Sequence, residues 1–138
     1  MGIDPTEDYV STTEGLTIRV RSFYLDDQSR PEENHYLWAY RVRIENRGVV
    51  TVQLLQRTWH ITDARGRMQH VHGDGVVGEQ PIILPGSAFE YRSGTPLQTP
   101  SGLMSGVYRM IETNSGRVFD AVIPPFSLDS PYQPGGLQ

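Results

Sequence analysis

The chain has 138 residues, a length typical of one domain with a single core, and 37% of the residues are hydrophobic. Its net charge of −4 argues against general nucleic-acid binding, and its lack of cysteine excludes disulfides, thiolate metal sites and a cysteine nucleophile. No apolar run approaches the roughly 20 residues of a transmembrane helix, and the N-terminus resembles no signal peptide, so we expect a cytoplasmic protein without membrane insertion.

Two stretches in the first third of the chain alternate apolar and polar residues with the period of a β-strand. In residues 16–24 the apolar face carries Leu16, Ile18 and Val20. In residues 36–46 the apolar face carries Tyr36, Trp38, Tyr40, Val42 and Ile44. The polar loop between the two stretches has too few apolar residues for a core. We therefore predict two half-buried strands joined by a loop.

The sequence in the middle of the chain predicts a β-hairpin, followed by an irregular segment that covers the sandwich. Residues 49–63 form a long β-branched and apolar run that ends at a turn in 63–66. A shorter strand in 67–71 is expected to pair back across that turn. Residues 80–86 carry two prolines, which favour a covering loop or short edge segment. Alternation resumes in 87–93.

The last third predicts a second hairpin, in residues 106–126, with its turn at 114–116. About seven strands result, and no stretch sustains helical spacing for three turns. The fold expected is an all-β, antiparallel β-sandwich of the immunoglobulin-like kind. We place the domain at 15–128, between a flexible N-terminal segment at 1–14 and a flexible C-terminal tail at 129–138.

Three segments resemble the ApaG family of bacterial proteins, which is also called CorD. They are QLLQRTWHITDARGR, HVHGDGVVGEQPIILPGSAFEYRSGTPL and GLMSGVYRMIETNSGRVFDAVIPPFSL, within a likeness that covers about residues 16–129. The resemblance implies a fibronectin type III-like sandwich. It also implies links with cobalt tolerance, magnesium efflux and an operon that neighbours a dinucleoside tetraphosphate hydrolase, without an assigned reaction. ApaG-like domains inside larger eukaryotic proteins look like protein-interaction modules.

The segment HVHGDGVVGEQP contains a glycine spacing found in pyrophosphate-binding loops, at Gly73, Gly75 and Gly78. A dinucleotide fingerprint also needs a helix to begin directly after its glycines. Pro81 and Pro85 exclude that helix, although a nest of backbone N–H groups remains a possible anion site. We expect glycines that shape a tight loop, with phosphate binding as the alternative.

Histidines just ahead of these glycines suggest a second candidate site, for a divalent cation. His70 and His72 are two residues apart on a predicted strand, so their imidazoles share one face. His60 on the partner strand and Asp74 would complete a ligand set. Magnesium prefers carboxylates and water to imidazole, and paired histidines often have no metal, so the favoured interpretation is solvated histidines.

Arginines on the polar faces of the first two strands suggest a partner surface, formed by Arg19, Arg21, Arg41 and Arg43. If the two strands are neighbours, these side chains form a positive stripe on an acidic protein. Such a stripe would suit an acidic partner or a polyphosphate. The alternative is a solvated face whose charge is offset by Glu45 and nearby acids.

The sequence offers no recognisable catalytic residues. No serine lies in a G-x-S-x-G elbow, and most carboxylates fall in loops or termini, as in 26–27 and 32–33. Trp38 and Trp59 fall in apolar phases and are expected in the core. We therefore predict a non-enzymatic module, without a cofactor, that binds an unidentified partner protein through loops or edge strands. The alternative is a binder of nucleotide, pyrophosphate or divalent cation at the glycine loop.

Overall fold

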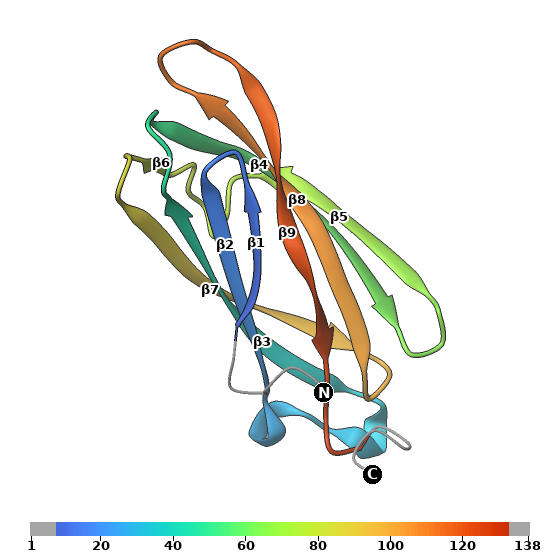
Figure 1. Cartoon of the computed structure of the whole chain (residues 1–138). Coiled ribbons are helices and arrows are strands. Elements are labelled where there is room, and N and C mark those ends of the chain that lie inside the picture. The colour runs from blue at the N-terminus through green and yellow to red at the C-terminus, as the bar shows by residue number, and fades with distance from the viewer. Residues whose placement is uncertain (1–7, 133–138) are drawn as a thin grey trace.

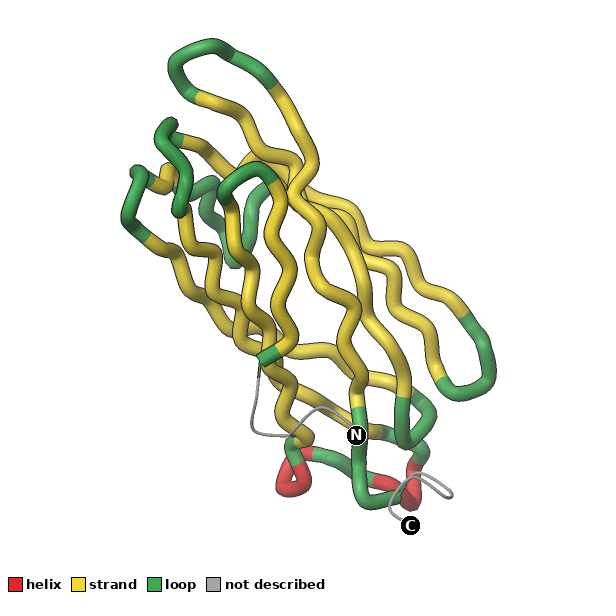
Figure 2. Tube along the Cα trace, viewed as in Figure 1, coloured by secondary structure: helices red, strands yellow, loops and turns green. Residues whose placement is uncertain are grey.

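Two antiparallel β-sheets pack face to face in the computed structural model, which describes residues 8–132 (Figure 1). The first sheet has the order β1–β2–β3–β7, with β1 (Tyr9–Thr13), β2 (Leu16–Tyr24), β3 (Tyr36–Asn46) and β7 (Ala88–Leu97). The second has the order β5–β4–β8–β9, with β5 (Met68–Asp74), β4 (Val52–Asp63), β8 (Gly102–Glu112) and β9 (Val118–Leu128). The short β6 (Ile82–Ile83) also pairs with β4. Two 3-10 turns, η1 (Asp26–Gln28) and η2 (Pro31–Glu33), lie at one end of the sandwich (Figure 2).

The predicted all-β sandwich is confirmed, with nine strands rather than about seven in the described residues. The strands beyond the expected number include β6, which lies in the predicted covering segment, and β1. β1 falls in the segment 1–14, which the sequence assigned to a flexible N-terminus, yet it pairs along β2 from Tyr9 opposite Val20 to Thr13 opposite Leu16. A short, polar strand carries little periodic signal, and its order comes from pairing with a neighbour.

Residues 129–132, at the start of the predicted C-terminal tail, pack against the end of the sandwich. The indole Nε1 of Trp38 donates to the carbonyl oxygen of Asp129 at 2.8 Å. The hydroxyl of Ser130 donates to the carbonyl oxygen of Pro100 at 2.6 Å. The domain thus extends beyond residue 128. The remaining parts of both predicted end segments, 1–7 and 133–138, lie outside the described residues.

The inner faces of the sheets form one apolar core, and the predicted strand faces are confirmed. The eight apolar residues predicted on the inner faces of β2 and β3 are each at most 7% exposed. Trp59 of β4 is 3% exposed, and its ring centroid lies 5.4 Å from that of Tyr40 and 6.0 Å from that of Phe126. The contact between Tyr40 and Trp59 has edge-to-face geometry and joins the two sheets, whereas Trp59 and Phe126 belong to the same sheet.

The two long sides of the sandwich differ. Along one side, β1 and β2 meet β9: Ser11 Oγ donates to the Val122 carbonyl at 2.5 Å, and Ser22 Oγ donates to the Ser127 carbonyl at 3.0 Å. Along the other side, the outer strands are β7 and β5, and in the described residues each pairs with one neighbour only. Figure 1 shows the β4–β5 hairpin projecting at the lower right, away from β1 and β2. This side of the sandwich is therefore open.

Candidate functional site

The glycine segment after β5 forms a tight turn held by its own backbone. Val76 N–H donates to the Glu79 carbonyl at 2.8 Å, and Glu79 N–H donates to the Val76 carbonyl at 2.9 Å. The two residues between them, Val77 and Gly78, have φ values of 43° and 81°, as in a type I′ turn. The chain then continues into β6, so no helix follows the glycines, as the prolines predicted.

Gly73 and Gly75 lie where neighbouring atoms leave no room for a side chain. A Cβ atom at Gly75 would lie 2.2 Å from the Glu79 carbonyl oxygen, and the N–H of Gly75 donates to the Leu55 carbonyl at 2.8 Å. A Cβ atom at Gly73 would lie 3.0 Å from Nη1 of Arg57, because that guanidinium lies across Gly73. The glycine spacing that resembles a phosphate-binding loop is thus explained by a tight turn and by the contact between Gly73 and Arg57.

The histidines share one face of the second sheet, as their spacing predicted. His70 lies opposite His60 on β4, and the two exposed rings stack with centroids 4.6 Å apart. His72 Nδ1 and Thr58 Oγ1 are hydrogen-bonded at 2.8 Å. Asp74 Oδ1 accepts a long hydrogen bond of 3.4 Å from Gln56. Residues 8–132 contain no group of three or more histidine, aspartate or glutamate side chains arranged for a metal ion.

The predicted arginine surface is assembled on the outer face of β2 and β3, with Arg19 opposite Arg43 and Arg21 opposite Arg41. Each of these arginines lies within 4.0 Å of a carboxylate. Glu45 accepts from Arg43 Nε at 2.9 Å and lies 3.4 Å from Arg19 Nε, and the hydrogen bond from Arg43 lowers the pKa of Glu45. A second carboxylate, Asp8, lies 2.9 Å from Arg21 Nε and 3.7 Å from Arg41 Nη2. The stripe is therefore a network of ion pairs.

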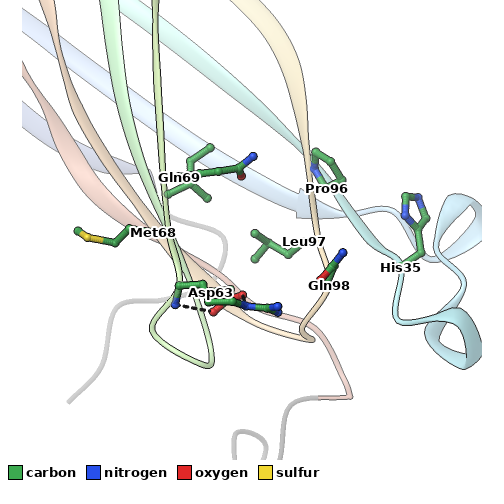
Figure 3. A pocket seen from close by; sticks show the side chains of 9 residues that line it. His35, Asp63, Met68, Gln69, Pro96, Leu97 and Gln98 are labelled. Carbon is green, nitrogen blue, oxygen red and sulfur yellow. Dashed lines mark hydrogen bonds and ion pairs between the residues drawn. The ribbon is translucent and has the colours of Figure 1, made fainter.

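A groove that sequence reasoning missed runs along the open side, between β5 and β7. A hollow of about 440 Å³ shares Ile61, Gln69 and Pro96 with a second hollow of about 220 Å³, so the two adjoin. Figure 3 shows the larger hollow, with Gln69 on the hairpin pointing toward Pro96 on β7. We call this feature the β5–β7 groove. Its walls are Ile61, Gln69 and Val71 on the hairpin side and Ser93, Thr95 and Leu97 on the β7 side.

Arg57 lies at one end of the β5–β7 groove. It belongs to β4, opposite Gly73 on β5 and Tyr108 on β8. Its Nη1 donates to the backbone carbonyls of Asp74 and Gly75, each at 2.9 Å. These two bonds fix the half-buried guanidinium at the end of the groove, where it places a positive charge beside the core.

Tyrosine hydroxyls lie behind this end of the groove, and Tyr40 is one of the residues that line it. The hydroxyls of Tyr91 and Tyr108 are 2.5 Å apart and buried between the sheets. Burial raises the pKa of both phenols and of Tyr40, while the charge of Arg57 acts in the opposite direction. All three hydroxyls therefore stay protonated in neutral solution and can donate hydrogen bonds.

Comparison with known proteins identifies the family. The ApaG domain model matches residues 26–112. Protein ApaG of Paramagnetospirillum magneticum is 61% identical over 125 residues, which cover 91% of this chain and 95% of that protein. This chain belongs to the ApaG family. Protein ApaG of Rhodospirillum centenum is 58% identical over 124 residues, covering 90% of this chain and 95% of that protein.

A solved structure also matches the fold. The crystal structure of a Bordetella pertussis protein described as ApaA superimposes with a TM-score of 0.82 and 41% identity, over 92% of this chain and 99% of that one. The name ApaG assigns no enzymatic reaction to the curated relatives. Within residues 8–132, no helix has the length and hydrophobicity needed to cross a membrane.

Arg57 carries one signal in the sequence that sequence reasoning overlooked. Along β4, Arg57 has the same phase as Trp59 and Ile61, both of which are buried on the inner face. A charged residue in an inward phase is unusual and marks a place where the interior opens to solvent or to a ligand. The location of β7 beside this position depends on long-range pairing, which no local pattern reveals.

Proposed function

We propose that this ApaG-family chain is a non-enzymatic module that binds a partner protein by adding an extended segment of it along β5, over the β5–β7 groove. The observation that carries the proposal is the free edge of β5. Its seven residues pair with β4 on one side, and the described residues place no strand on the other. An edge strand exposes unpaired N–H and C=O groups that a partner strand can satisfy.

The edge of β5 is better suited to strand addition than the edge of β7. β7 contains Pro96, which has no N–H, and exposes the charges of Glu90 and Arg92. Such residues discourage pairing at a sheet edge. β5 contains no proline, and its one aspartate, Asp74, is its last residue, so its backbone is the more accessible of the two.

The wall of the groove provides contacts for side chains of an added strand. Ile61 and Leu97 are buried apolar residues that line the larger hollow, and Val71 lines the smaller one. Alternate side chains of an added strand would point inward onto these residues, which is how strand addition combines backbone pairing with side-chain selection.

The other predicted surfaces receive less support. The four arginines of the stripe share Glu45 and Asp8, which neutralise part of its charge, so it has less charge to offer a partner. In the glycine turn, the N–H groups of Gly75, Val76 and Glu79 donate to carbonyls of this chain, which argues against the nucleotide alternative. A link with cobalt tolerance and magnesium efflux, as the family resemblance implies, would then act through the bound partner.

A displayed library of random heptapeptides, selected on the intact chain, tests the proposal. We expect enriched peptides that protect β5 amides from hydrogen exchange. Val71→Trp fills the groove and should weaken their binding at least about tenfold, whereas His70→Trp, on the outer face of the same strand, should change it less than about twofold. Thermal unfolding of both variants controls for folding. Failure to enrich any peptide, or binding that leaves β5 exchange unchanged, would refute strand addition here.

A further inference from the structure

We infer that Arg57 anchors an acidic side chain of the bound segment, so that the groove selects an aspartate or glutamate at one inward-facing position. This inference rests on the proposed strand addition and names the chemistry that the site selects. The carboxylate of the partner would approach through the hollow of about 220 Å³ that Arg57 lines.

The hydrogen bonds of Arg57 leave donors for a ligand. Nη1 is held by the carbonyls of Asp74 and Gly75, and no hydrogen bond joins Nε or Nη2 to any residue in 8–132. A guanidinium presents five N–H donors in a rigid fork that matches a carboxylate. Because the bonds at Nη1 already fix its plane, Arg57 needs little ordering when a carboxylate binds.

Arg57 is also unusual among the arginines of the chain. Within the described residues, Arg57, Arg65 and Arg92 lack a carboxylate within 4.0 Å. Arg65 and Arg92 are exposed, and Arg92 stacks over the ring of Phe23, 5.7 Å from its centroid. Arg57 alone of the three is half-buried, so water screens its charge least and an incoming carboxylate gains most there.

The surroundings favour a carboxylate over a phosphate. Tyr40 and Ser93 line the same hollow, and a hydrogen bond between their hydroxyls leaves one O–H of the pair to donate to a carboxylate oxygen. One guanidinium balances the single charge of a carboxylate, whereas a phosphate brings a charge of about −1.5 to −2. The chain has no lysine to supply the second positive charge.

The spacing of the groove wall predicts a pattern in the ligand. Arg57, Trp59 and Ile61 point inward at successive alternate positions of β4, and Val71 lies opposite Trp59. Side chains of an added strand have the same period of two. In the bound segment, the acidic residue that contacts Arg57 would therefore lie two positions from an apolar residue, which faces the larger hollow.

The experiment compares the heptapeptides selected on wild-type protein with those selected on Arg57→Gln. On wild type we expect an acidic residue two positions from an apolar one. An N-acetylated, C-amidated synthetic copy should bind at least about tenfold more weakly when its acidic residue is changed to the amide, and the same loss should appear with Arg57→Gln. Combining both changes should cause little further loss.

Controls separate the inference from the proposed function. Arg65→Gln, at the exposed hairpin turn, should leave affinity within about twofold. If Arg57→Gln does not fold, the change from acid to amide in the peptide still tests the contact on wild-type protein. Enriched peptides that protect β5 but lack an acidic residue would refute the role of Arg57 and leave strand addition intact. Tighter binding after replacing the acid with phosphoserine would refute the selection of a carboxylate.

Discussion

At residue 77, a β-branched side chain occupies the left-handed region of the backbone. Val77 has φ 43° at the first central position of its type I′ turn, where asparagine and glycine are favoured. Its side chain is 55% exposed, so core packing does not require it. We expect Val77→Asn to raise the free energy of unfolding by about 1 kcal/mol, measured by urea denaturation.

The neighbouring position provides the matched control. Gly78 has φ 81°, and a Cβ atom there would contact nothing within 4 Å, so Gly78→Ala tests backbone strain without a steric clash. It should lower the free energy of unfolding by about 1 kcal/mol. If Val77→Asn and Gly78→Ala changed the free energy of unfolding in the same direction, backbone strain would not govern this turn.

The sequence predicted individual residues well where burial follows from strand phase. Trp38 and Trp59 were placed in the core from their apolar phases, and both are buried. Arg57 shares the phase of Trp59, yet its role depends on Gly73 from one neighbouring strand and on the open edge near Ser93 from the other sheet. Residues distant in sequence supply those surroundings, so local pattern could not reveal them.

At the scale of elements, ion pairs join two turns at one end of the sandwich. Arg117, in the turn between β8 and β9, donates from Nη2 to Glu112 at 2.8 Å and also bonds Glu14 of the β1–β2 turn. The hydrogen bonds from Arg117, and then from Ser115, lower the pKa of Glu112 below its ordinary value of 4.5. Glu112 therefore stabilises the fold at pH values above 4.5, and this contribution is lost as pH falls through the lower, folded-state pKa.

Replacing Glu112 should reduce the acid sensitivity of the fold. We expect the difference in urea midpoint between wild type and Glu112→Gln to be present at about pH 6 and to shrink toward about pH 3. Glu79→Gln, an exposed substitution with no ion pair among the described residues, is the control. A difference that stays constant with pH would contradict the assigned role of the Glu112 carboxylate.

Elements with local signals were predicted, and those that depend on neighbours were not. The turn residues at 63–66 and 114–116 predicted two hairpins, which the structure confirms as β4–β5 and β8–β9. β1 was missed because its residues, YVSTT, provide little apolar alternation. Hydrogen bonds along β2 and contacts with β9 order it instead.

At the scale of the whole molecule, a buried pair of phenols joins the two sheets. Tyr91 belongs to β7 and Tyr108 to β8, and their hydroxyls are 2.5 Å apart. Tyr91→Phe would leave the hydroxyl of Tyr108 without this partner in the core. We expect a loss of about 1–3 kcal/mol in the free energy of unfolding, measured by urea denaturation.

The double variant provides the internal comparison. Removing both hydroxyls, in Tyr91→Phe with Tyr108→Phe, leaves no buried unpaired phenol and should be less destabilising than Tyr91→Phe alone. Additive losses in the two single variants would mean that the hydroxyls do not act as a pair.

The sequence predicted which residues of β2 and β3 face the core, because the period of two in 16–24 and 36–46 is a local property of each strand. It also determined the class of fold and, through its resemblance, the family. The strands that lie outermost could be learned from the fold alone, since sheet order depends on pairing between segments far apart in the chain. Within residues 8–132, that order leaves β5 and β7 without outer partners, and it places Arg57 at the end of the groove between them.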